Sequence, residues 1–85
     1  MKNSTKLEVD DQIKLMKVGK LLKEYRVDSY LSRQDVEDMY GVSRSTVERV
    51  ENGNNLTLLT FFKLICAYDV SLLDFIQNLE EEIYD

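Results

Sequence analysis

The sequence contains no histidine, no tryptophan, no proline and only one cysteine among its 85 residues. A structural zinc site needs about four cysteine or histidine ligands, so this chain cannot build one, and a lone cysteine cannot form a disulfide within the chain. Without histidine, the Ser-His and Cys-His nucleophiles of many hydrolases are excluded as well. These absences predict a protein without a metal or other cofactor, and they argue against an enzyme.

Long apolar runs are also missing. No stretch approaches the roughly 18 residues of a membrane helix, and Met1–Lys6 is too polar for a signal peptide. A hydrophobic share of 44% beside a charged share of 32% is typical of a folded globular domain. We therefore expect one cytoplasmic domain that makes no contact with a membrane.

The charge is negative overall and unevenly distributed. Eleven basic and sixteen acidic residues give a formal charge of −5. Met1–Arg26 carries seven basic and four acidic side chains, whereas Asn54–Asp85 carries one basic and six acidic ones. Since nucleic acids are polyanions, binding to them would depend on a few well-placed cations near the start and middle of the chain.

Apolar residues recur at helical spacing along almost the whole chain, and only three glycines interrupt them. This pattern predicts an all-α fold with five helices. In the first helix Leu15, Val18 and Leu22 form one apolar stripe, Asp10 or Asp11 is the expected cap, and the end falls near residues 27–29. We expect residues 1–9 to be flexible and residues 10–85 to form a single domain.

The second and third helices are predicted to be short and close together. Ser32 followed by Asp35 resembles a capping box at the start of a helix over about 33–40, which Gly41 would end. Ser43 would cap the next helix, over about 44–52. Two short helices joined by a turn of about three residues form a helix-turn-helix unit. The inward face of the first of them is predicted to contain Val36, Met39 and Tyr40.

Two further helices complete the prediction. Thr57 would cap a fourth helix that reaches Tyr68, and Asp69 would break it, because Asp tolerates the left-handed conformation better than most residues. Ser71 would then begin a fifth helix over about 71–83.

Several segments resemble the Cro/CI-type (Xre-like) helix-turn-helix regulators, whose DNA-binding domains are similar to that of lambda repressor. They are Val18–Arg26, Leu31–Val36, Gly41–Gly53 and Lys63–Leu72, and the similarity extends over about residues 18–76. The most specific of them is the Gly-Val-Ser … Glu-Asn-Gly segment. The resemblance implies a five-helix fold and sequence-specific binding of double-stranded DNA by a transcriptional regulator, expected to be a repressor.

The resemblance also assigns roles to residues near the third helix, which would lie in the major groove. Arginine can bond the O6 and N7 atoms of guanine bidentately, a chemistry that suits Arg44 at the first turn. Arg49 points about 140° away from it and would contact the next base step or a phosphate. The implied base contacts are Arg44, Ser45, Thr46 and Arg49, and the implied phosphate contacts are Arg33, Ser43, Asn52 and Gly53, although Ser43 also suits a helix cap.

Arg26 and Glu51 occupy positions where some members of the family hold a buried ion pair between the first helix and the recognition helix. The alternative is that they are two independent surface charges, which would contribute little to stability.

Three residues depart from the family pattern. Glu37 stands where the family places a small alanine, so its stem would bend outward and would change the helix crossing or leave a negative charge near DNA. Tyr30 replaces a glycine, which predicts a different connecting loop after the first helix. Asp69 replaces a second glycine more tolerably.

A second surface is suggested by apolar residues where the family is usually polar. Leu59, Cys66 and Leu73 are spaced seven residues apart, and Leu72, Ile76, Leu79 and Ile83 follow one side of the fifth helix. They suggest a two-fold homodimer that binds a palindromic site. The alternative is that these residues complete the core of the monomer. Cys66 suits a small core hydrophobe better than a redox sensor.

A different class of function stays open at this point. The negative charge would also suit a helix-turn-helix module that binds a protein, such as an antitoxin, an antirepressor or an inhibitor of a nucleic-acid enzyme. The arginines at the family's contact positions favour DNA instead. A hydrolase with paired carboxylates has no supporting motif in the sequence.

Overall fold

The computed structural model describes residues 8–84, which form five α-helices and no strand. The helices are α1 (Val9–Asp28), α2 (Arg33–Tyr40), α3 (Arg44–Glu51), α4 (Leu58–Ala67) and α5 (Leu72–Tyr84). Within residues 8–84, no helix is both long enough and apolar enough to cross a bilayer. Of the segment expected to be flexible, residues 1–7 lie outside the described part, and Val9 already belongs to α1.

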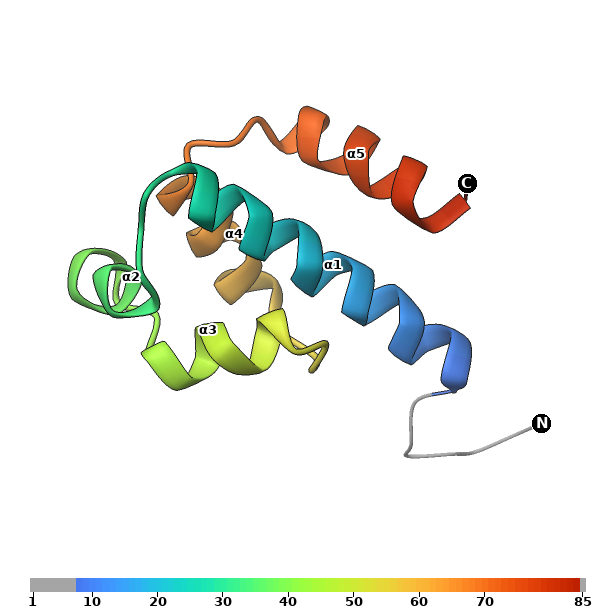
Figure 1. Cartoon of the computed structure of the whole chain (residues 1–85), viewed down its shortest axis with the longest axis horizontal. Helices are drawn as coiled ribbons and strands as arrows, with labels where there is room; N and C mark the ends of the chain where they lie inside the picture. Colours follow the sequence, from blue (N-terminus) through green and yellow to red (C-terminus); the bar gives the residue numbers. More distant parts are fainter. Residues whose placement is uncertain (1–7, 85) are drawn as a thin grey trace.

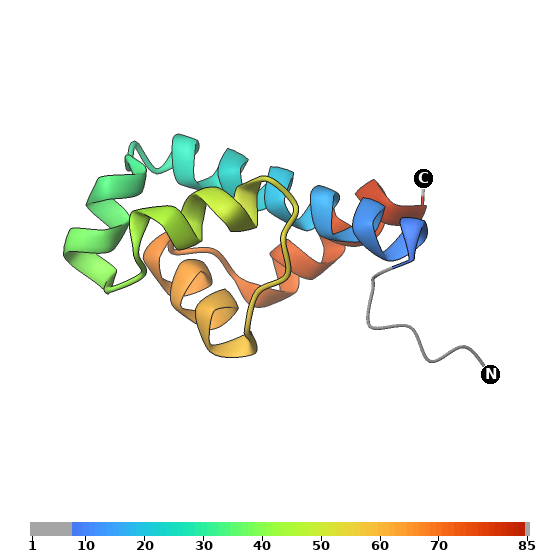
Figure 2. The same cartoon turned by 90° about the horizontal axis from the view of Figure 1, so that it is seen from below.

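The long helix α1 organises the others. It packs against α3 on one side and α5 on another, and α2 packs against α3 and α4 (Figures 1 and 2). The short turn Gly41–Ser43 joins α2 to α3, as the helix-turn-helix prediction requires. This arrangement leaves the outer face of α3 on the surface of the molecule (Figure 2).

Each helix contributes one large, completely buried side chain to the core. They are Leu22, Val36, Val47, Leu64 and Phe75, from α1 to α5 in order. The ring of Phe75 lies 5.3 Å from that of Phe61, edge to face, and 5.8 Å from that of Tyr25. Because all five helices meet in one core, the fold holds α3 rigidly with respect to the other helices.

Gly19 allows α1 and α3 to approach each other closely. A Cβ atom at this position would lie 2.2 Å from the carbonyl oxygen of Val50, which is far inside van der Waals contact. This role of Gly19 could not be predicted from the sequence, because a glycine inside a helix does not indicate which element lies opposite it.

The helix ends confirm most of the predicted caps. Ser32 and Asp35 form the capping box, with hydrogen bonds of 3.0 and 2.8 Å, and Gly41 ends α2 in the left-handed conformation at a φ of 73°. Ser43 and Thr57 cap α3 and α4. The expected cap of α1 was wrong, because the helix begins at Val9 and places Asp10 and Asp11 inside its first turn.

In the described part of the chain, residues 8–84, two residues other than glycine take positive φ values, Tyr30 at 60° and Asp69 at 51°. Asp69 therefore ends α4 as predicted. Tyr30 accepts a conformation that favours glycine, and its side chain is 94% exposed. Tyr30, in place of the family's glycine, therefore keeps the left-handed conformation at the cost of local backbone strain.

The predicted inward face of α2 was partly wrong. Val36 is buried, but Met39 is 62% exposed and Tyr40 is also exposed. An eight-residue helix makes barely two turns, so its apolar spacing fixes the direction of its buried face poorly.

Candidate nucleic-acid interface

The outer face of α3 carries the predicted base-reading side chains. Val47 and Val50 are buried against the core, so the opposite side of the helix faces solvent. Arg44, Ser45 and Arg49 are exposed on that side, and Thr46 is half-buried. The structure thus places the four predicted residues on α3, which lies at the outside of the helical fold (Figure 2).

Neither guanidinium on α3 forms an ion pair with a carboxylate of residues 8–84, although the charge of Arg44 lies close enough to Glu37 to help lower the pKa of that carboxyl. Within residues 8–84, the Arg44 side chain forms no hydrogen bond or ion pair, and the Arg49 side chain makes one long hydrogen bond of 3.5 Å, from Nη2 to Thr46 Oγ1. Both guanidinium groups therefore keep most of their donors for an external acceptor.

Ser43 is engaged as a helix cap. Its Oγ accepts a hydrogen bond from the Thr46 backbone N–H at 3.2 Å and lies 2.7 Å from Thr46 Oγ1, to which its hydroxyl donates. This small network satisfies one of the first amides of α3 and orients Thr46.

The Glu37 side chain, on α2, contacts the N-terminus of α3. Its Oε1 accepts a hydrogen bond from the Arg44 backbone N–H at 2.7 Å, and its Oε2 accepts one from Gln34 Nε2 at 3.2 Å. The backbone amide of Arg44 is the main cause that lowers the pKa of this carboxyl, and the Gln34 amide adds to it. The stem of Glu37 bends toward α3, and its charge lies next to the first turn of that helix.

A cluster of charged side chains joins three helices behind the interface. The predicted pair of Arg26 and Glu51 is present, with Nε 2.7 Å from Oε2, and the Glu51 side chain is only 1% exposed. Arg33 from α2 contacts Oε1 of the same carboxylate at 3.0 Å. Glu51 raises the pKa of the Arg26 guanidinium mainly through this hydrogen bond.

Arg33 therefore has a partner that its sequence position did not indicate. Its Nε and Nη2 atoms contact Glu51, while its side chain remains 33% exposed. Its predicted phosphate contact would have to use the remaining N–H groups. The spacing of 18 residues between Arg33 and Glu51 gave no signal of this contact, because it depends on how α2 crosses α3.

Tyr68 lies close to the same cluster. Burial raises the pKa of its hydroxyl strongly, and Glu51 adds to the effect. The hydroxyl is buried and finds no hydrogen-bond partner within residues 8–84. Its proton therefore stays on throughout the physiological range.

The turn after α3 corrects one predicted phosphate contact. The Gly53 backbone N–H donates to the carbonyl of Val50 at 3.0 Å, and the Asn54 N–H donates to the carbonyl of Arg49 at 3.0 Å. These amides are used within the turn, so Gly53 has no free backbone donor for a phosphate. The exposed side chain of Asn52 is the group that remains available at this end of α3.

The predicted partner surface is largely exposed. Five of its seven residues are exposed, namely Leu59, Cys66, Leu72, Leu73 and Ile76, while Leu79 and Ile83 are half-buried. Of the exposed side chains, Leu73 is among the most accessible at 66%. The alternative that these residues complete the monomer core was wrong for the exposed five, Cys66 included.

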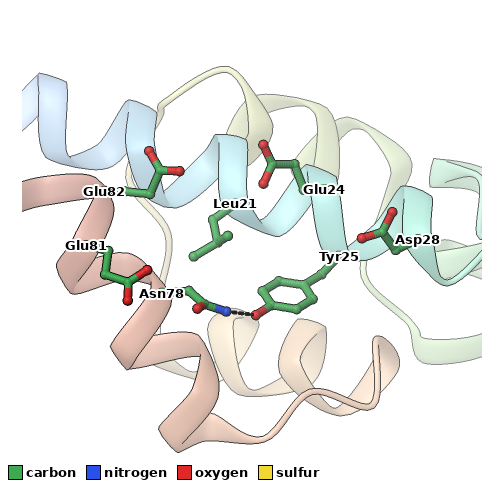
Figure 3. A pocket seen from close by; sticks show the side chains of 7 residues that line it. All are labelled: Leu21, Glu24, Tyr25, Asp28, Asn78, Glu81 and Glu82. Carbon is green, nitrogen blue, oxygen red and sulfur yellow. Dashed lines mark hydrogen bonds between the residues drawn. The ribbon is translucent and has the colours of Figure 1, made fainter. Parts of the chain in front are cut away.

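A hollow of the described chain lies elsewhere, between α1 and α5. It has a volume of about 640 Å³ and is surrounded by the carboxylates of Glu24, Asp28, Glu81 and Glu82 (Figure 3). Asn78 donates a hydrogen bond to the Tyr25 hydroxyl across it. This charge would repel phosphate groups, and no set of three metal-ligating side chains is grouped together in residues 8–84.

The comparisons with known proteins agree with this geometry. A family model described as helix-turn-helix (HTH_3) matches residues 22–75, which is more than half of the chain. The chain belongs to this family of Xre/Cro-CI-like helix-turn-helix proteins and is a DNA-binding transcriptional regulator. The family is a DNA-binding regulator family rather than an enzyme family. No curated protein matches the sequence.

Solved structures similar to this chain include several of the restriction-modification controller protein C.Esp1396I. The wild-type protein is 25% identical, with a TM-score of 0.76 over 85% of this chain and 96% of the other. A tetramer of that protein in complex with its natural 35 base-pair operator is 25% identical, with a TM-score of 0.75 over the same shares. A mutant form gives 24% identity and a TM-score of 0.78 over 86% of this chain and 99% of the other.

Proposed function

We propose that this regulator binds a specific DNA sequence by inserting α3 into the major groove. The observation that carries this proposal is the pair of exposed arginines on α3, Arg44 and Arg49, neither of which forms an ion pair with an acidic side chain of residues 8–84. In this account Arg44 reads a guanine bidentately at the first turn of the helix, and Arg49 reads the adjoining step or bonds a phosphate. Ser45 and Thr46 complete the base contacts.

Contacts to the DNA backbone would fix the register of α3. Arg33 stands at the first turn of α2 with part of its guanidinium accessible, and Asn52 is exposed at the end of α3. The Ser43 hydroxyl already caps α3 and donates its proton to Thr46 Oγ1, so a phosphate contact would require Ser43 to redirect that proton to the phosphate oxygen. Such contacts position the protein without reading the sequence.

We further propose that the protein acts as a homodimer on a palindromic site. The exposed apolar side chains of α4 and α5 support this, since a surface of this kind is seldom left uncovered. A two-fold axis would place two copies of α3 about 34 Å apart, one helical turn of DNA. The tetramer that C.Esp1396I forms on its operator supports double-stranded DNA as the partner.

Repression by occupying a promoter is the simplest regulatory outcome for such a complex. It would take place in the cytoplasm, and residues 10–85 would act as a single DNA-binding domain.

Titration of the protein into fluorescently labelled DNA tests the proposal. The DNA comes from the region upstream of the protein's own coding sequence, and the titration is repeated at several salt concentrations. Because bound phosphates release counterions, the logarithm of the binding constant should fall with the logarithm of salt concentration with a slope of several units. Binding to one segment should exceed binding to a scrambled duplex. Equal affinity for both would contradict sequence-specific recognition.

A second candidate is recognition of a protein partner, which the net charge of −5 favours. The acidic residues near α3 include Asp35, Glu37, Asp38 and Glu48. A complete lack of salt-dependent binding to any DNA in the titration above would favour this candidate.

A further inference from the structure

Glu37 connects the two helices of the helix-turn-helix unit by a contact that runs from side chain to backbone. Its carboxylate lies on α2, seven residues before Arg44, and accepts the first backbone N–H of α3 at 2.7 Å. Gln34 holds the other oxygen and also donates to Asp38 Oδ1 at 2.9 Å. The carboxylate is therefore fixed from two sides.

The start of α3 needs such a partner. The first amides of a helix have no acceptor within the helix, and α3 has no acidic residue in its first turn. Ser43 satisfies the amide of Thr46 only. A negative charge at this end of the helix also interacts favourably with the helix dipole. Glu37 supplies both the acceptor and the charge.

The same carboxylate affects what the recognition helix offers to DNA. A free amide at a helix N-terminus is a binding site for a phosphate, and here Glu37 occupies it. In the proposed complex, its negative charge would also lie close to the duplex into which α3 inserts. Both effects lower the affinity for DNA of any sequence, while the bond to the Arg44 backbone restricts the direction in which the Arg44 side chain leaves the helix.

We propose that Glu37 is a positioning residue that fixes the start of α3 and thereby Arg44, increasing sequence discrimination at the expense of overall affinity for DNA. The effect on discrimination rests on the proposed function, whereas the contact between Glu37 and α3 does not. Two experiments therefore test the proposal: a structural arm on the protein without DNA, and a binding arm that measures affinity for DNA.

The structural arm uses the protein without DNA. The amide proton of Arg44 is followed by NMR between about pH 3 and pH 6, the range in which carboxyl groups titrate. Because Glu37 accepts this proton, the Arg44 amide shift should follow the ionisation of Glu37, with a midpoint below the usual value for Glu. The Glu37→Gln variant should abolish this titration. An Arg44 amide that does not respond to pH in the unaltered protein would overturn the proposal.

The binding arm separates the charge from the hydrogen bond. Glu37→Gln removes the charge and keeps an oxygen that can accept the Arg44 amide, whereas Glu37→Ala removes both. Asp38→Ala is the matched control, since Asp38 is an acidic neighbour on α2 whose hydrogen bond goes to Gln34 and not to α3. All three variants should bind a scrambled duplex more tightly than the original protein does, because each loses a negative charge.

Only Glu37→Ala should lose discrimination between the preferred site and the scrambled duplex, by about tenfold. Glu37→Gln and Asp38→Ala should keep it. Unchanged discrimination in Glu37→Ala, or an equal loss in Asp38→Ala, would contradict the positioning role. If the unaltered protein shows no site preference at all, the proposed function fails, and the NMR arm still decides whether Glu37 caps α3.

Discussion

Arg26 Nε lies 2.7 Å from Glu51 Oε2, and this contact joins the last turn of α1 to the last turn of α3. Since Arg33 reaches the other oxygen at 3.0 Å, one carboxylate joins α1, α2 and α3. The three helices carry or position every residue that we assign to DNA contact. The cluster therefore acts as a structural brace for the interface.

Removal of Glu51 should be costly. Glu51→Ala leaves the largely buried guanidinium of Arg26 without its carboxylate, so we expect a loss of about 3–5 kcal/mol in the free energy of unfolding. Arg33→Ala should cost about 1 kcal/mol or less, because Arg33 is one-third exposed and Arg26 still pairs with Glu51. Urea unfolding measures both variants. An equal loss of unfolding free energy in Glu51→Ala and Arg33→Ala would show that the contribution of the cluster does not depend on burial.

Tyr30→Gly should stabilise the protein. Tyr30 has a φ of 60°, which costs a residue with a side chain about 1 kcal/mol more than glycine, and its exposed ring loses little packing when it is removed. We expect a gain of up to about 1 kcal/mol in thermal or urea unfolding, reduced by the greater freedom of glycine in the unfolded chain. Ser29→Gly is the control, because Ser29 has a φ of −87° and should gain nothing.

The elements of the fold could be predicted from the sequence because local signals specify them. Capping residues such as Ser32 and Ser43, and the left-handed position at Gly41, depend on the backbone next to them. The hydrogen bond from the Arg44 amide to Glu37 could not be predicted, nor could the contact of Arg33 with Glu51. Both depend on the angle at which α2 meets α3, which the packing of the whole core decides.

The exposure of residues on the short helix α2 was predicted less well, because it too depends on how the helices pack. Met39 follows the apolar spacing of α2, yet it is exposed, because a helix of barely two turns fixes the direction of its buried face poorly. For the interface, the direction of α3 was predictable since Val47 and Val50 are buried on one side. The hydrogen bond of the Gly53 amide could not be predicted, because the hydrogen bonds within a turn depend on its backbone conformation.

The capping box predicts a pH dependence of stability. Hydrogen bonds from the backbone and side chain of Ser32 lower the pKa of Asp35 in the folded protein. The ionised form therefore stabilises the fold above the ordinary pKa of about 4, and this contribution disappears as the pH falls through the lowered value. Asp35→Asn should be less stable than the original protein at pH 7, and the difference should shrink toward pH 2. A difference in urea unfolding that stays constant over this range would contradict the assignment.

Leu73→Glu should disrupt the proposed homodimer without unfolding the monomer. Leu73 is 66% exposed and lies on α5, so a charge there is tolerated in a monomer and disfavoured in a dry interface. Sedimentation at micromolar concentration should shift from twice the chain mass of 10.0 kDa toward the single chain. Val27→Glu is the matched control, since Val27 is exposed on α1 outside that surface. A single-chain mass for the unaltered protein would exclude the dimer at this concentration.

The most direct test of the account measures site discrimination in Arg44→Ala and Arg49→Ala beside Lys63→Ala, which removes the same charge from α4. Each protein is titrated against its preferred duplex and a scrambled one at a fixed salt concentration. We expect the ratio of the two affinities to fall about tenfold or more in Arg44→Ala, and in Arg49→Ala if that residue reads a base, because a bidentate arginine–guanine contact is worth about 1–3 kcal/mol. Lys63→Ala should leave the ratio unchanged. If Arg44→Ala and Arg49→Ala both keep the original ratio, α3 does not read the DNA sequence through its arginines.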